Sequence, residues 1–170
     1  MTGLVKTDPP NPGRCTRMKG DASRAREDKI ISRALRIVEG RARAPGRPMG
    51  DPDSCGAYFR LRLGNEEREH FEAAFLDSRN RLIATERLFS GTIDGAQVSP
   101  RIVAQRALAL NATAVVLAHN HPSGHPEPSS ADRAITAHLK DILQILDVRL
   151  LDHFVVTADH AVSLAVRGLL

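Results

Sequence analysis

The front of the chain contains one stretch in which apolar side chains return every three or four positions. This pattern begins at Asp28 and ends near Gly40, and it predicts an amphipathic helix with a basic polar face. Residues 1–27 combine proline, glycine and charge without apolar periodicity, so we expect a flexible basic tail there. A linker rich in proline and glycine follows, and helix and linker together occupy residues 28–49. Residues 50–170 then remain for a single folded domain.

In the first part of this domain the apolar runs are short and typical of strands. Tyr58–Leu63, His70–Leu76 and Leu82–Phe89 each predict a strand. The polar turn Asp77–Asn80 joins the second and third runs into a hairpin. We therefore expect the start of the domain to be mainly β-structure.

The second part of the domain alternates helical and strand patterns. Ser99 followed by Pro100 predicts the start of a helix that ends near Asn111. Residues 113–118 form an unbroken apolar run that predicts a buried strand. A second amphipathic helix follows, and residues 148–157 predict a further buried strand. Elements in this order predict an α/β fold in which helices flank a mixed β-sheet.

Composition is typical of an ordinary globular protein. The 170 residues are 42% hydrophobic and 26% charged, which suits one domain with a substantial core. Cys15 and Cys55 are far apart in sequence, which argues against a disulfide framework and a cysteine-based zinc site. The chain shows no apolar run of membrane-spanning length and no secretory signal, so we expect a cytoplasmic protein without membrane contact. The oligomeric state is unknown from sequence.

The net charge of +4 is concentrated at the front of the chain. Residues 1–49 contain 12 lysines and arginines against 5 acidic residues, whereas residues 50–170 contain 12 against 15. A basic segment can contact nucleic acid, although no aromatic residues are interleaved here. A solvated helix face is the simpler interpretation, and both remain open.

The strongest chemical signal follows the predicted buried strand. His119 and His121 are one residue apart, so both imidazoles point to the same side of an extended backbone. Asp132 comes eleven residues after the second histidine, in the first turn of the next predicted helix. Two imidazoles and one carboxylate leave the fourth position of a tetrahedral zinc ion open, as in catalytic zinc sites.

The same segment has an interpretation without a metal. Ser129 and Asp132 have the spacing of a helix N-cap with an acidic residue at the third helical position. This arrangement stabilises a helix by itself. The spacing alone therefore leaves a metal site and a simple cap both open.

Hydrolysis at such a site also requires a carboxylate that takes a proton from water and gives it to the leaving amine. The metal motif contains no such group, so we assign this role to Glu86, an acid in an apolar strand, with Glu127 as second choice. Ser129 or Ser130, at a helix N-terminus, could donate a hydrogen bond to the oxyanion.

Two further groups have open roles. Asp152 and His153 are adjacent on a predicted buried strand, where they could support the metal ligands or simply pack in the core. His125 lies in the loop after the histidine pair and could serve as a further ligand.

Residues 119–132 read HNHPSGHPEPSSAD and have the form H-x-H-x7-S-x-x-D. This form resembles the JAMM metal signature of JAB/MPN domains, and its opening residues with the PEPS-x-AD ending resemble the RadC-like bacterial branch in particular. The resemblance covers about Asp28 to Leu170. Outside the signature it rests on Glu86–Thr92, Pro100-Arg101, Asn111-Ala112 and Leu151–His153.

The resemblance implies a zinc-dependent peptidase or isopeptidase with the cytidine-deaminase-like architecture of JAB/MPN domains. It implies that His119, His121 and Asp132 bind Zn²⁺, that Glu86 is the catalytic glutamate and that Ser129 is the motif serine. The substrate is then expected to be a protein or peptide.

Two other functions remain open. The chain could be a non-catalytic interaction module that keeps the metal for stability. It could also be a DNA-repair-associated protein that binds DNA through its basic N-terminal region. A zinc deaminase is disfavoured, because the H-x-E and P-C-x-x-C motifs of that chemistry are absent from the sequence.

Overall fold

The computed structural model describes residues 12–44, 49, 51–91 and 98–170, with side chains from residue 22 onward. The chain divides into two compact units, residues 1–34 and residues 35–170. The first eleven residues of the predicted tail, and residues 45–48 and 50 around the predicted linker, lie outside the described residues.

The first helix begins earlier than its apolar pattern predicts. α1 spans Pro12–Arg43, so the predicted flexible tail is wrong for residues 12–27. Every side chain from 22 to 33 except Ile31 is exposed, so no core contact imposes an apolar period on this segment. Helix-favouring alanine and arginine residues stabilise the backbone instead, and Ser23 donates a hydrogen bond of 3.1 Å to Glu27 one turn later.

At 32 residues α1 is the longest described helix, but its exposed side chains are mostly polar or charged. No helix within the described residues is both long and apolar enough to cross a membrane.

A helix also stands where the first strand was predicted. α2 spans Pro52–Leu63, so the predicted strand at Tyr58–Leu63 is wrong. The carboxylate of Asp51 caps the helix by accepting the N–H of Ser54 at 2.9 Å, and Pro52 occupies the first turn. This start signal outweighs the short alternation of apolar residues and arginines on which the strand prediction relied. The buried residues of α2 have helical spacing: Cys55, Gly56, Tyr58, Phe59 and Leu63.

Five strands of the described chain form one sheet in the order β2-β1-β3-β4-β5. β3 and β4 run parallel, whereas β1 runs antiparallel to both β2 and β3, and β5 runs antiparallel to β4. The predicted mixed sheet is confirmed, but β5 has three residues and is too short for a periodic signal. The remaining elements are β1 His70–Leu76, β2 Leu82–Ser90, α3 Pro100–Ala109, β3 Ala114–Asn120, α4 Ser130–Ile145, β4 Arg149–Val156 and β5 Ala161–Ser163.

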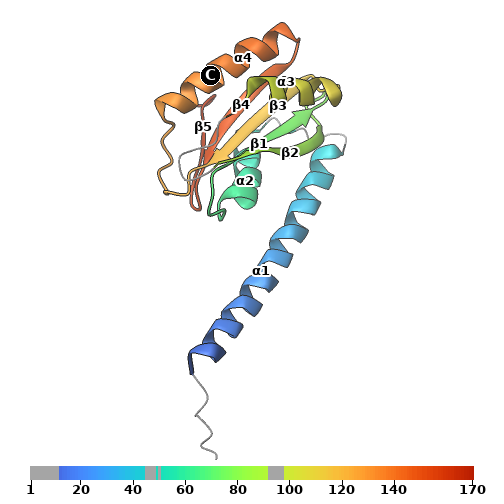
Figure 1. The fold of residues 1–170 in the computed structure, drawn as a ribbon. Coiled ribbons are helices and arrows are strands. Elements are labelled where there is room, and N and C mark those ends of the chain that lie inside the picture. The colour runs from blue at the N-terminus through green and yellow to red at the C-terminus, as the bar shows by residue number, and fades with distance from the viewer. Residues whose placement is uncertain (1–11, 45–48, 50, 92–97) are drawn as a thin grey trace, which may run out of the picture. The chain divides into compact units, whose positions relative to one another are not determined.

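Helices flank both faces of this sheet, with α3 and α4 on one face and α2 on the other (Figure 1). Val115 and Leu117 of β3 enter the core beneath α3 and α4, while Val116 and Ala118 enter the core beneath α2. Because side chains alternate along a strand, His119 points to the face that α3 and α4 cover. The fold thus places the first histidine beside α4.

One acid on the α2 face is completely buried and is paired on two sides. Glu72 of β1 accepts hydrogen bonds from Arg62 of α2 at 2.6 Å and from Arg87 of β2 at 3.1 Å. Arg62 also pairs with Glu39 at 3.0 Å, and Arg87 also pairs with Glu66 at 2.7 Å. A buried charge needs such partners to offset its lost hydration. The network joins α2 to β1 and β2.

Candidate metal centre

The two histidines lie where β3 ends. His119 is 2% exposed, and its backbone pairs with Phe71 of β1 and Val155 of β4. His121 comes just after the strand, and its backbone N–H donates to the carbonyl of Val156 at 2.8 Å. Both imidazoles point to the same side, as the spacing predicts, and their Nε2 atoms are 3.0 Å apart.

Asp132 approaches this pair from the first turn of α4. Ser129 is the N-cap of the helix, and its hydroxyl accepts the N–H of Asp132 at 3.1 Å while the Asp132 carboxylate accepts the N–H of Ser129 at 2.7 Å. The same carboxylate places Oδ1 3.2 Å from Nε2 of His119 and Oδ2 3.5 Å from Nε2 of His121. Asp132 therefore caps the helix and also lies where the sequence predicts a metal ligand.

The three side chains are close enough to shift one another's pKa values. Burial raises the pKa of Asp132, but the adjacent imidazoles of His119 and His121 outweigh burial and hold that pKa well below its ordinary value. The hydrogen bond with Asp132 raises the pKa of His121 against the opposing effect of burial, and the charge of Glu69 adds a smaller increase. The carboxylate is thus kept ionised next to two imidazoles.

The three ligand atoms fit a zinc ion in donor type and in spacing. With Zn–N and Zn–O bonds of about 2.0–2.1 Å, the ligand atoms of a tetrahedral site are about 3.3–3.4 Å apart. The two Nε2 atoms are 3.0 Å apart, Oδ1 of Asp132 is 3.2 Å from that of His119, and Oδ2 of Asp132 is 3.5 Å from that of His121. His121 can offer a bare Nε2, because its Nδ1–H donates to the backbone carbonyl of His125 at 2.8 Å. Among the described residues, His119, His121 and Asp132 form the one cluster with the spacing of metal ligands.

A groove of about 800 Å³ opens beside these ligands. Its walls are the loop before β1 and the loop between His121 and α4. Glu69, in the first loop, is half-buried, and within the described residues its carboxylate has no hydrogen bond or ion pair. Glu127, in the second loop, is paired with Arg167 at 2.5 Å. Glu69 therefore places beside the ligands a carboxylate that pairs with none of the described residues.

Asn120 connects the first of these loops to β3 by hydrogen bonds. Its side-chain oxygen accepts the N–H of His70 at 2.8 Å, and its amide donates to the carbonyls of Arg68 at 2.8 Å and Glu66 at 3.3 Å. Asn120 itself is 2% exposed. These bonds hold the backbone on both sides of Glu69 against the end of β3.

The structure does not bring Glu86 to the metal ligands. Glu86 of β2 pairs with Ala73 of β1, which pairs with Leu117 of β3, so two strand spacings, or roughly 10 Å, separate Glu86 from β3. Its carboxylate accepts two hydrogen bonds from Arg106 of α3, one at 2.7 Å and one at 2.5 Å. The bond to Arg106 lowers the pKa of Glu86 against the opposing effect of burial. These contacts give Glu86 a structural partner away from the metal centre.

The adjacent Asp152 and His153 point to opposite faces of the sheet and have different roles. Asp152 accepts hydrogen bonds from the hydroxyl of Ser163 at 2.5 Å and the N–H of Ala165 at 3.0 Å, so it holds the segment after β4. His153 is completely buried, and its Nε2 is 2.9 Å from Nδ1 of His119. Burial, assisted by the neighbouring His119, holds the pKa of His153 well below its ordinary value.

Sequence reasoning missed Glu69 and Asn120. Glu69 directly precedes β1, and β1 runs antiparallel to β3, so its start lies beside the end of β3. Recognising this requires the order of the strands in the sheet, which the apolar pattern does not contain. Asn120 lies between two predicted ligands. A polar residue at the end of a predicted buried strand was the sequence signal that could have identified it.

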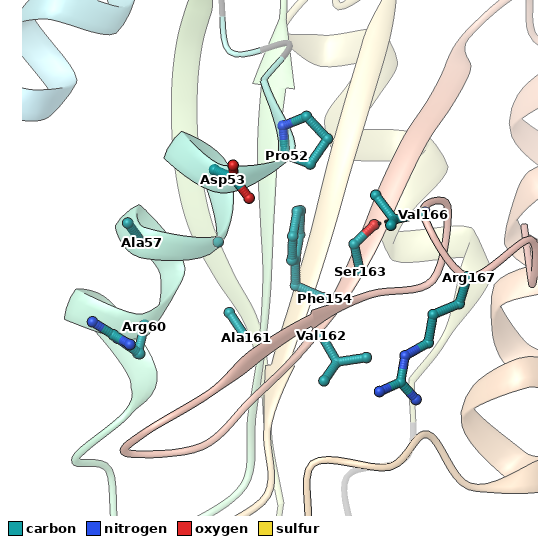
Figure 2. A pocket seen from close by; sticks show the side chains of 11 residues that line it. Pro52, Asp53, Ala57, Arg60, Phe154, Ala161, Val162, Ser163, Val166 and Arg167 are labelled. Atoms are coloured by element: carbon teal, nitrogen blue, oxygen red, sulfur yellow. Dashed lines mark hydrogen bonds between the residues drawn. The ribbon is translucent and has the colours of Figure 1, made fainter.

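A second pocket of about 410 Å³ lies on the other face of the sheet, between α2 and β5 (Figure 2). Phe154 and Ala161 form part of its wall, and none of the predicted site residues lines it. Its two arginines are already engaged, because Arg60 donates to the carbonyl of Asp159 and Arg167 pairs with Glu127. The groove beside the histidines therefore remains the candidate functional site.

A mixed sheet between helices, with a His-x-His pair at the end of a strand and an aspartate in the cap of the next helix, defines a JAB-type domain. The family model described as RadC-like JAB domain matches residues 49–169, and the chain belongs to this family. The resemblance predicted from residues 119–132 is confirmed.

Curated relatives carry a name without an activity. A UPF0758 protein of Xanthomonas oryzae pv. oryzae (strain PXO99A) is 56% identical over 123 residues, which are 72% of this chain and 55% of that protein. A UPF0758 protein of Stenotrophomonas maltophilia (strain K279a) is 57% identical over 126 residues, 74% of this chain and 54% of that protein. The chain thus spans about half the length of these relatives.

Proposed function

We propose that this protein is a zinc-dependent hydrolase of the JAMM class that cleaves an amide bond in a protein or peptide. One observation carries the proposal. At the edge of a groove the Nε2 atoms of His119 and His121 are 3.0 Å apart, and the two carboxylate oxygens of Asp132 lie 3.2 Å from the first and 3.5 Å from the second. Glu69 lines the same groove, and its carboxylate pairs with none of the described residues. A purely structural metal site would need neither the groove nor the carboxylate.

The residues of the site divide the chemistry among them. A zinc ion held by the three ligands would supply a Lewis acid that lowers the pKa of water to about 7. Glu69 takes a proton from water on its carboxylate and passes it to the nitrogen of the leaving amine. Ser129, whose hydroxyl donates to Asp132 at 2.6 Å, turns this hydrogen to the oxyanion of the substrate carbonyl.

The proposal is tested first by zinc content and then by turnover. Purified protein should contain one zinc ion per chain, and His121→Ala should lose it. Glu69→Gln should keep fold and zinc but lower cleavage of a peptide library, measured by mass spectrometry, by about 10²–10⁴-fold. Glu67→Gln is the matched control, because Glu67 lines the same groove two residues away.

The outcomes separate an enzyme from a binding module. Protein without stoichiometric zinc, or a His121→Ala variant that keeps it, contradicts the metal site. A zinc-loaded protein without turnover on any peptide, or with equal turnover in Glu69→Gln, favours a non-catalytic interaction module.

A second candidate function is DNA binding through the N-terminal region. Seven lysines and arginines are exposed between residues 22 and 44 of the described chain, against three acidic residues, of which Glu39 is paired with Arg62. Such a segment attracts phosphates in a salt-dependent way. Deleting residues 1–34 removes four of these seven basic residues and should weaken salt-sensitive binding to duplex DNA in a mobility-shift assay. Unchanged binding after the deletion contradicts this candidate.

A further inference from the structure

His153 is a buried side chain in contact with a metal ligand but outside the ligand set. It is 0% exposed, and its ring packs edge-on against Phe71 with centroids 5.4 Å apart. Its Nε2 is 2.9 Å from Nδ1 of His119, and its Nδ1 is 2.6 Å from the hydroxyl of Thr136 on α4. The Thr136 hydroxyl is in turn 2.5 Å from the backbone carbonyl of Asp132. This relay therefore joins two of the three ligands.

The backbone carbonyl of Asp132, at one end of the relay, determines the direction of every hydrogen bond in it. A carbonyl oxygen only accepts, so at 2.5 Å the hydroxyl hydrogen of Thr136 must point to Asp132, because two facing lone pairs would repel. Thr136 has no second hydrogen, so it accepts the Nδ1–H of His153. A neutral His153 then carries a bare Nε2.

The near end of the relay faces the metal centre. Since Nε2 of His153 is bare, Nδ1 of His119 carries the hydrogen and donates to it. A neutral His119 then has no hydrogen on Nε2, the atom that lies 3.2 Å from Asp132 and 3.0 Å from His121. If the hydrogen bonds ran in the opposite direction, Nε2 of His119 would carry a hydrogen and could not bind a metal ion.

We propose that His153 is a positioning residue that, with Thr136, keeps His119 in the tautomer that binds metal. The inference rests on the proposed zinc site and adds how one ligand is prepared for it. His121 needs no such residue, because a backbone carbonyl, that of His125, accepts its Nδ1–H. The same task is thus performed by the backbone for one histidine and by a side-chain relay for the other.

A packing role for His153 is the competing explanation, and two substitutions separate the roles. His153→Leu fills the space without an acceptor, whereas His153→Gln can place an amide oxygen near the position of Nε2. We expect zinc affinity, measured by competition with a colorimetric chelator, to fall about 10–100-fold in His153→Leu and to be largely kept in His153→Gln. Thr136→Val, nearly the same size as threonine, should weaken zinc binding in the same direction, while Thr136→Ser should retain it.

A spectroscopic measurement tests the relay in the unmodified chain. Long-range ¹H–¹⁵N correlations of the imidazole rings should show the His153 proton on Nδ1, both in metal-free protein and with zinc. A proton on Nε2 of His153 overturns the proposal, as does a folded Thr136→Val or His153→Leu variant with wild-type zinc affinity. If the wild-type chain bound no zinc, the proposed function would fail, and the ring spectrum of metal-free protein would still decide the relay.

Discussion

The Asp132 carboxylate caps a helix and also belongs to the candidate metal centre. Its Oδ2 accepts hydrogen bonds from the N–H and the hydroxyl of Ser129, at 2.7 and 2.6 Å, and its Oδ1 faces His119. The hydrogen bonds of the cap fix the side-chain angle, so the carboxylate would already be oriented for the proposed zinc ion. The spacing of a helix cap in the sequence is therefore compatible with a metal-ligand role for the same residue.

At the same scale, the pairing of Glu86 with Arg106 leads to a prediction. Glu86→Gln should retain zinc and turnover, because its carboxylate is two strands from β3 and is bonded to α3. Stability should fall only slightly and only at neutral pH. The arginine lowers the pKa of Glu86, so its contribution exists above the ordinary pKa of a glutamate and is lost as the pH falls through the lowered value.

Urea unfolding at pH 7 and at pH 3, together with peptide turnover, measures both parts of this prediction. Arg106→Gln is the matched control, since it breaks the same pair from the other side. A large loss of turnover in Glu86→Gln with zinc retained would restore Glu86 as the proton acceptor.

Single residues differ in how far the sequence can locate them. His119 and His121 depend only on the alternation of one strand, and Asp132 depends only on the first turn of a capped helix. Each relation is local, so spacing predicts it. The choice between Glu86 and Glu69 depends on which strand lies beside β3, and that is set by pairing between distant segments.

At the scale of elements, start signals and apolar periods compete. β1, β2, β3, β4, α3 and α4 were predicted close to their observed bounds because each has one buried side or two. α2 was mistaken for a strand over its last six residues, although Asp51 and Pro52 mark a helix start. α1 extends beyond its apolar period because an exposed helix needs propensity rather than pattern.

The junction between β3 and the loop before β1 gives a prediction for Asn120. Asn120→Ala removes the acceptor of the His70 N–H and the donors to Arg68 and Glu66, so Glu69 should lose its position. An unpaired buried N–H costs about 1–3 kcal/mol of stability. Turnover should fall by about tenfold or more, since small misplacements of a catalytic group are costly. Zinc content should stay at the wild-type level, because none of the three ligands is touched.

Asn120→Asp makes a useful comparison in the same assays. It keeps the oxygen that accepts from His70 but loses both donors, so its fall in turnover should lie between wild type and Asn120→Ala. Equal turnover in all three proteins, with zinc present, would separate the loop from catalysis.

At the scale of the whole molecule, the core of the second unit extends into α1. Ala42 and Met49 are 8% and 6% exposed and belong to the core beneath α2, and Leu35 and Val38 pack against it. Glu39 also accepts hydrogen bonds from Tyr58 and Arg62 of α2. The family model begins at residue 49, so the folded unit starts earlier than the segment shared with the family.

This boundary predicts different outcomes for two N-terminal deletions. Removal of residues 1–34 leaves the core residues in place, so the free energy of unfolding, measured with urea, and the zinc content should remain close to those of the full chain. Removal of residues 1–49 takes away Ala42, Met49 and Glu39, one of the two acidic partners of Arg62, and it should lower the free energy of unfolding by about 2 kcal/mol or more. If both shortened chains unfold at the same urea concentration, the end of α1 adds nothing to the core, and the stable unit coincides with the shared family segment.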